Sequence, residues 1–115
     1  MAIEPQITFR HMPSSPAVET AIREKVAKLE KLAPQITRCE VLVEEPHRSH
    51  RKGDLFHVRV HMFLPGGEVV VVRDPKDPSE HEDVYVALRD AFDAARRQLE
   101  THLRRRRHDG RHAAE

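Results

Sequence analysis

The sequence has few of the residues that form cross-links, metal sites or membrane spans. It contains one cysteine, Cys39, so an internal disulfide and a Cys-x-x-Cys zinc or redox motif are excluded. No uncharged apolar run approaches the roughly 20 residues that span a bilayer, and the first ten residues lack the pattern of a secretory signal. We therefore expect a cytoplasmic protein with no membrane partner, in which Cys39 faces the core and stays unreactive.

Aromatic side chains are also scarce, which limits what can fill the interior. The 115 residues include four Phe, one Tyr and no Trp, while 38% of them are hydrophobic and 34% are charged. A chain of this length supports one modest domain, and its core must be mainly aliphatic. We expect this domain to cover residues 1–107, followed by a disordered basic tail over residues 108–115 that lacks apolar periodicity.

The charges are balanced in number but unevenly distributed. Lys and Arg total 20 against 19 Asp and Glu, so net charge alone does not indicate a nucleic-acid partner. Residues 74–95 contain seven acids and two bases, whereas residues 96–112 contain seven arginines and two acids. A further basic stretch, residues 47–61, has four basic side chains and four histidines against one acid. Two basic segments therefore flank an acidic one.

Strand signals occur in four segments. Apolar and polar residues alternate over residues 6–11, 36–44 and 55–64, and a run of four valines favours a strand over residues 68–73. The turn Pro65-Gly66-Gly67 joins the last two strands and predicts a hairpin.

Helical spacing occurs in two segments. The dipeptide Ser15-Pro16 is typical of a helix N-terminus, and apolar residues then recur at spacings of three and four as far as Ala33. Ser79 and Glu82 fit a capping box for a second helix, which is predicted to end near Arg107. Its acidic first turn and basic last turn suit the helix dipole.

The predicted order is β-α-β-β-β-α, in which two amphipathic helices can cover one face of a four-stranded sheet. This is an α+β two-layer sandwich, similar in its helix and sheet order to the double-stranded RNA-binding domain. The opposite face of the sheet would carry Arg10, Arg38, Arg59 and the histidines, open to solvent or to a partner.

Several segments resemble one family, the ribosome hibernation-promoting factors and ribosome-associated translation inhibitors. The segments that resemble it in order and spacing are Ile7-Thr8 with Arg10, Ser15-Pro16-Ala17-Val18, Ala27-Lys28-Leu29-Glu30-Lys31, Leu64-Pro65-Gly66-Gly67-Glu68, His81-Glu82-Asp83-Val84-Tyr85 and Arg97-Gln98-Leu99. Together they cover roughly residues 5–103. The resemblance implies a non-enzymatic domain, monomeric off the ribosome, that occupies the mRNA and tRNA channel of the small ribosomal subunit and blocks translation.

The resemblance also directs basic side chains at ribosomal RNA, with Lys25, Lys28, Lys31 and Arg97 on matching positions. Basic residues from the two helices, the sheet and the basic stretch complete the set that we expect to bind RNA: Arg10, Arg23, Lys25, Lys28, Lys31, Arg38, Arg48, Arg51, Lys52, Arg59, Arg89, Arg96, Arg97, Arg104 and Arg105. Such contacts release condensed counterions, so affinity should fall steeply with salt.

Simpler interpretations of the same residues stay open. Lys28 and Lys31 could form a solvated helix face that pairs with Glu24 and Glu30, and the chain could be a general RNA-binding module. However, a double-stranded RNA-binding domain lacks a strand before its first helix. A third possibility is a protein-interaction domain that uses the acidic loop of residues 74–83.

The sequence gives little support for catalysis or for a bound cofactor. The four histidines of the basic stretch, His47, His50, His57 and His61, match no established zinc spacing. No nucleophile and base pair is apparent, and the acids near the second helix are explained by capping and solubility. We therefore expect no catalytic residue, metal, cofactor or small-molecule substrate.

Overall fold

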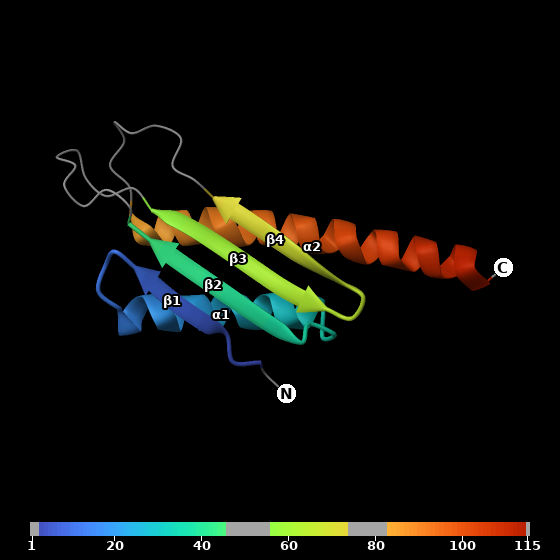
Figure 1. The fold of residues 1–115 in the computed structure, drawn as a ribbon, viewed down its shortest axis with the longest axis horizontal. Coiled ribbons are helices and arrows are strands. Elements are labelled where there is room, and N and C mark those ends of the chain that lie inside the picture. The colour runs from blue at the N-terminus through green and yellow to red at the C-terminus, as the bar shows by residue number, and fades with distance from the viewer. Residues whose placement is uncertain (1–2, 46–55, 74–82, 115) are drawn as a thin grey trace.

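The computed structural model describes residues 3–45, 56–73 and 83–114, with side chains as far as Arg106. These residues form four strands and two helices, which follow one another in the predicted order (Figure 1). They are β1 (Gln6–Arg10), α1 (Pro16–Leu32), β2 (Arg38–Glu44), β3 (His57–Leu64), β4 (Gly67–Arg73) and α2 (Val84–Ala114). No helix in these ranges is both long enough and apolar enough to cross a membrane.

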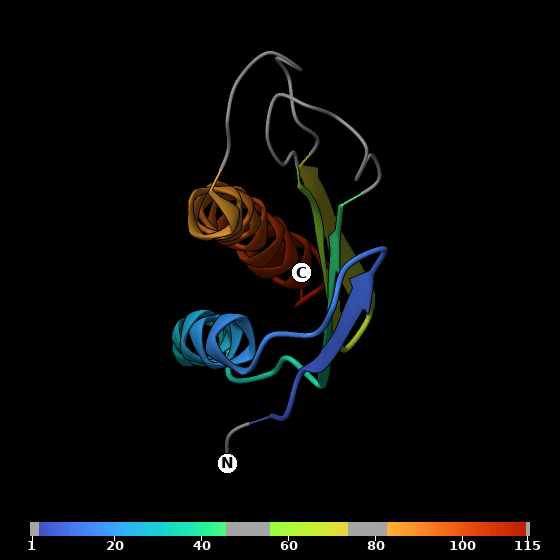
Figure 2. The ribbon, with the colours of Figure 1, turned by 90° about the vertical axis from the view of Figure 1, so that its left-hand side faces the viewer.

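The strands form one mixed sheet in the order β1-β2-β3-β4. β1 is parallel to β2, as the intervening α1 crossover requires, while β2, β3 and β4 pair antiparallel. Figure 2 shows both helices on one side of the sheet, and no described helix or strand covers the other side, which we call the open face. The predicted α+β two-layer sandwich is therefore confirmed.

The core lies between the helix layer and the sheet and is mainly aliphatic, as predicted. One stripe of each helix and alternate residues of β2, β3 and β4 are buried. The side chains that are fully or almost fully buried include Val18, Ile22, Val26, Leu29, Cys39, Val41, Val43, Val58, Val60, Met62, Leu88, Phe92, Ala95 and Leu99. β1 is less buried, since its side chains alternate between exposed and half-buried.

The N-terminus of α1 forms where the sequence predicts it. The Ser15 hydroxyl accepts a hydrogen bond from the backbone N–H of Val18 at 3.3 Å, and Pro16 occupies the first turn. The cap satisfies one of the amides that a helix start leaves unpaired.

Both ends of α2 differ from the prediction. The helix starts at Val84, and the Asp83 carboxylate accepts a 2.7 Å hydrogen bond from the N–H of Tyr85. Asp83 therefore caps the helix, whereas Ser79 and Glu82 lie outside the described residues. The predicted end near Arg107 is wrong because the helix continues to Ala114. A helix that projects beyond the core buries no face there, so apolar periodicity cannot mark its end in the sequence.

The β3–β4 hairpin contacts the projecting part of α2. Gly66 has a φ of +83°, which glycine adopts without strain, and it follows Pro65 in a two-residue turn. A Cβ on Gly66 would lie 3.0 Å from the guanidinium nitrogens of Arg106, and one on Gly67 would lie 3.0 Å from the His102 ring. The two glycines therefore allow α2 to pack closely on the turn.

Candidate nucleic-acid interface

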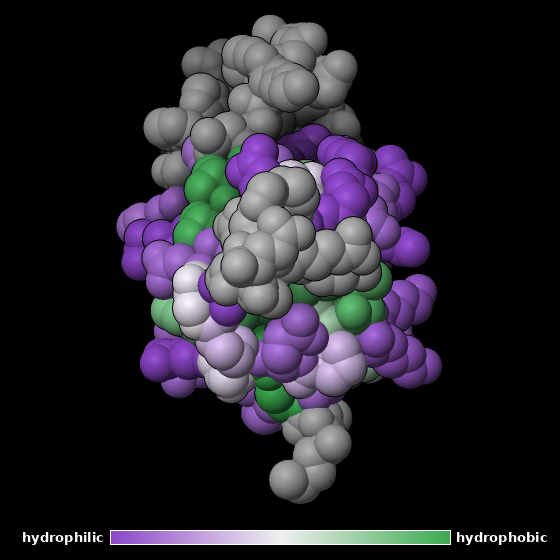
Figure 3. All heavy atoms as spheres, turned by 90° about the vertical axis from the view of Figure 1, so that its right-hand side faces the viewer, coloured by the Kyte–Doolittle hydropathy of each residue, from purple (hydrophilic) through white to green (hydrophobic). Residues whose placement is uncertain are grey.

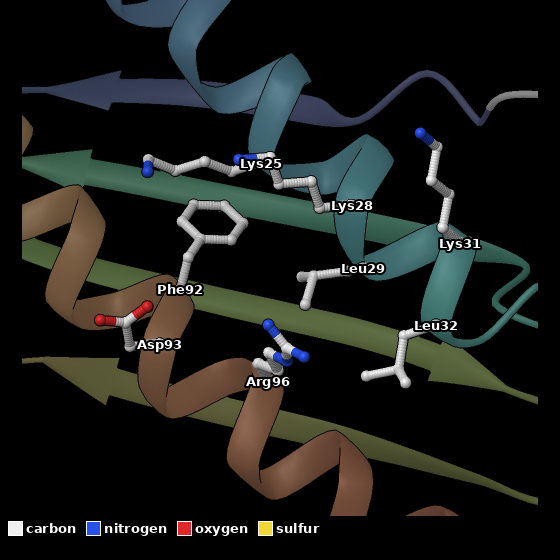
Figure 4. A pocket seen from close by; sticks show the side chains of 8 residues that line it. All are labelled: Lys25, Lys28, Leu29, Lys31, Leu32, Phe92, Asp93 and Arg96. Carbon is white, nitrogen blue, oxygen red and sulfur yellow. The ribbon is translucent and has the colours of Figure 1, made fainter.

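A groove with a volume of about 480 Å³ runs between the two helices. All of its lining residues belong to α1 or α2, so it lies in the helix layer and away from the open face of the sheet (Figure 4). They are Lys25, Lys28, Leu29, Lys31, Leu32, Phe92, Asp93 and Arg96. We call this feature the interhelix groove.

The helix periodicity explains this composition. Leu29 and Phe92 belong to the buried stripes of α1 and α2, and they form an apolar floor where the two helices meet. Residues next to a buried stripe lie at the edge of the helix contact, which places Lys25 and Lys28 along one rim and Arg96 along the other. Long basic side chains can cover apolar surface while their charged ends stay in water.

The lysines of the groove are not neutralised by nearby carboxylates. Within the described residues, Lys25, Lys28 and Lys31 form no ion pair, and the Glu30 carboxylate instead accepts a 3.1 Å hydrogen bond from the N–H of Ile3. The alternative in which Lys28 and Lys31 pair with neighbouring glutamates is therefore not seen.

On the opposite rim, Arg96 lies 3.6 Å from Glu100, and the two side chains are 68% and 40% exposed, so this is a weak contact screened by solvent. Asp93 is the one acid among the lining residues, against four bases. The groove therefore presents an excess of positive charge over an apolar floor.

The basic surface continues along the seam between the helices toward the hairpin. Two smaller hollows share Leu32 and Leu103 with each other, and they add Arg104 and Arg106 to the basic side chains of the seam. The extended arrangement suits a long anionic partner better than a small molecule.

Comparisons with known proteins identify the family. Residues 6–107 match the model of the sigma 54 modulation protein / S30EA ribosomal protein family. The chain belongs to this S30EA family. The match confirms the family resemblance noted in the sequence.

Two relatives, both called ribosome hibernation promoting factor and both from Pseudomonas putida, are 28% identical over 96 residues, which is 84% of this chain and 82% of theirs. The S30EA fold also matches solved structures. The N-terminal domain of Thermus thermophilus Protein Y superposes with a TM-score of 0.67 at 17% identity, covering 86% of this chain and 98% of that domain. A ribosomal subunit interface protein from Coxiella burnetii gives 0.64 at 15% identity, covering 87% and 97%.

The other basic residues predicted for this S30EA member divide between the two faces. Arg10, Arg38 and Arg59 lie on the open face of the sheet, as expected. Arg38 donates a 2.9 Å hydrogen bond to Gln6 and lies 5.5 Å from the centre of the Phe63 ring. The register places three acids on the same face, Glu40, Glu44 and Glu68. The open face of the sheet is therefore close to neutral, unlike the interhelix groove.

Arg23 and Arg89 are engaged by carboxylates. Arg23 lies 3.0 Å from Glu4 and 3.4 Å from Glu19, and the hydrogen bond and charge of Glu4 raise the pKa of Arg23 above its ordinary value. Arg89 lies 3.4 Å from Asp90, which also pairs with Arg73. These arginines are less available to an anionic ligand than the lysines of the groove.

The remaining predicted residues are exposed or lie outside the described ranges. Arg97, Arg104 and Arg105 are exposed on α2. Arg48, Arg51 and Lys52 lie outside the described residues, as do His47, His50 and most of the acidic loop 74–83. Arg106, which lies on the seam, was not in the predicted RNA-binding set, although it belongs to the same run of four arginines as Arg104 and Arg105.

Other groups in the described ranges show no arrangement for chemistry. No three His, Cys, Asp or Glu side chains gather there as metal ligands would. Cys39 is 1% exposed, and burial raises the pKa of its thiol to about 12, with a smaller contribution from Glu40. A thiol in this environment stays protonated, as the sequence predicted for a core cysteine.

Proposed function

We propose that this chain is a non-catalytic ribosome hibernation factor that binds RNA of the small ribosomal subunit through the interhelix groove. By occupying the channel of mRNA and tRNA, it would exclude both and block translation. The names of its relatives support this class of function, since two are called ribosome hibernation promoting factors and one a ribosomal subunit interface protein.

The observation that carries the proposal is the cluster of lysines without ion-pair partners on the rim of the groove. Lys25, Lys28 and Lys31 follow one another at intervals of three residues, so their α-carbons rise by about 4.5 Å per step along α1. A row of unneutralised ammonium groups is suited to RNA phosphates, because each contact releases a condensed cation. Surface lysines without ion-pair partners add little to the stability of the fold, so an unpaired row is better explained by the binding of an anion.

The structure favours recognition of RNA shape and phosphates over recognition of particular bases. Base stacking needs accessible aromatic rings. On the sheet, Phe63 is stacked on His61 at a centroid distance of 4.1 Å and is also covered by Arg38. In the groove, Phe92 is 5% exposed, and Tyr85, which is 46% exposed in the first turn of α2, is not among the residues that line the groove. We therefore propose that folded ribosomal RNA, with its phosphates presented in fixed positions, is the partner.

Co-sedimentation with purified small subunits tests this proposal. The wild-type chain should bind, mRNA with initiator tRNA should displace it, and Lys28→Glu with Lys31→Glu should abolish binding while the fold is retained. Arg59→Glu changes a charge on the open face of the sheet, and under this proposal it should bind almost as the wild type does.

Three outcomes would count against it. Loss of binding in Arg59→Glu but not in the lysine variant would move the interface to the sheet. Equal affinity for free RNA and subunits would favour a general RNA-binding module. No binding at low salt would leave the protein-interaction alternative.

A further inference from the structure

The edge strand β4 is not protected in the way that sheet edges usually are. Natural proteins block exposed edges with short strands, prolines, bulges or charged residues. The other edge, β1, has five residues, follows Pro5 and carries exposed Arg10. β4 has seven residues, pairs with β3 without a bulge, and contains four consecutive valines, Val69–Val72. Its charged residues, Glu68 and Arg73, lie at the two ends of this run.

Two of these valines are exposed although they are apolar. Val69 and Val71 are 8% and 7% exposed and face the helices, whereas Val70 and Val72 are 47% and 56% exposed on the open face. Figure 3 shows apolar surface, in green at the upper left, on the sheet side of the molecule, with hydrophilic side chains around it. The exposed valines therefore add apolar area next to a free strand edge.

The register shows which backbone groups point outward. Leu64 pairs with Gly67 across the two-residue turn, and in such a hairpin the closing pair exchanges hydrogen bonds, after which every second pair does so. Gly67, Val69, Val71 and Arg73 therefore bond toward β3. The N–H and C=O groups of Glu68, Val70 and Val72 point away from β3, and no other strand of the described residues pairs with them. Such a row is a template on which another extended backbone can pair.

We propose that β4 pairs antiparallel with β4 of a second copy of this chain, with the twofold axis at Val70. In this register Val70 lies opposite its counterpart, Glu68 lies opposite Val72, and Val69 lies opposite Val71. The strand is thus complementary to itself: valines meet valines on both faces, and no like charges are opposed. About six interstrand hydrogen bonds would form, and the exposed valines would be covered on the open face.

The inference is independent of the proposed RNA interface, because the interhelix groove lies on the other side of the molecule (Figure 2). It replaces the expectation that the chain is monomeric when free. A single strand pair is a small contact, so the dimer is expected to be weak and concentration-dependent.

Sedimentation velocity across a concentration series tests the association. The wild-type mass should rise from that of a 13.3 kDa monomer toward twice that value. Val70→Pro removes one outward N–H that β3 does not use, so it should leave a folded monomer at every concentration. Val70→Lys serves the same purpose if the proline variant fails to fold, and Thr8→Lys on the open face of β1 is the matched control that should associate like the wild type.

Cysteine crosslinking tests the register, since the native Cys39 is buried. Directly opposed residues of a hydrogen-bonded pair lie about 5.5 Å apart at Cα, within disulfide range. Val70→Cys should form a crosslinked dimer under oxidation, whereas Val72→Cys, which is similarly exposed but faces Glu68, should not. Crosslinking at 72 without crosslinking at 70 would overturn the register. A wild type that stays monomeric, or association that persists in both Val70 variants, would overturn the proposal.

Discussion

Removing two lysines from the groove should change how strongly binding depends on salt. In the double variant Lys28→Gln, Lys31→Gln the side chains stay polar and keep a good helix propensity, but both positive charges are lost. Neither lysine is in the core or forms an ion pair within the described residues, so the fold should be retained. The effect on binding should therefore be electrostatic.

The structure sets the expected magnitude. The groove has four bases and one acid, which corresponds to between three and four phosphate contacts. At about 0.7 to 0.9 released counterions per contact, the slope of log affinity against log salt is about −3. A fourfold rise in salt should then weaken wild-type binding by about 60-fold. With two contacts removed the slope falls to about −1.5, and the same rise in salt weakens binding by about eightfold.

Equilibrium binding of the labelled chain to purified small subunits, measured over a salt series, gives both slopes. Arg23→Gln is the matched control: it removes one charge from the same helix, but from a side chain already paired with Glu4 and Glu19. Its slope should stay close to that of the wild type. An unchanged slope in the double lysine variant, or an equal change in Arg23→Gln, would contradict a specific electrostatic role for Lys28 and Lys31.

Further predictions concern stability. Ser15→Ala removes the cap of α1 and should lower the free energy of unfolding in urea by about 1 kcal/mol; an unchanged value would mean that the cap is not used. Gly66→Ala strains a φ of +83° and brings a Cβ within 3.0 Å of Arg106, so it should cost about 1–2 kcal/mol and lower the melting temperature, while a melting temperature at or above the wild type would contradict the turn geometry. The pKa of Cys39 is raised to about 12 in the folded state, so its contribution to stability is complete below pH 9 and is lost as the pH rises through the folded pKa. The wild type should therefore lose stability faster than Cys39→Ala between pH 9 and 12, and parallel curves would contradict the burial of the thiol.

Most of the fold could be predicted because burial imposes a period on the sequence. The stripe of Val18, Ile22, Val26 and Leu29, and the alternation around Val41, identified a helix and a strand directly. The ends of α2 could not be predicted in this way. Asp83 and Ser79 are both good N-caps, and the helix continues past Arg107 where no core exists to mark it.

The site was harder to predict than the fold. The basic residues could be identified from the sequence, but the groove depends on how α1 and α2 pack against each other, which brings Lys28 near Arg96 across a gap of more than sixty residues in the chain. The ion pairs could not be predicted from the sequence either. Arg23 and Lys28 are both basic residues of α1 with glutamates nearby in the chain, but of these two only Arg23 contacts carboxylates within the described residues. Tertiary packing therefore decides which charges stay available.

A cryo-electron microscopy structure of this chain bound to the small ribosomal subunit would show directly which surface contacts the RNA. We expect the interhelix groove to face ribosomal RNA in the mRNA and tRNA channel, with Lys25, Lys28, Lys31 and Arg96 at phosphates and the open face of the sheet turned away. A complex in which the sheet contacts the RNA, or in which the channel stays empty, would contradict it.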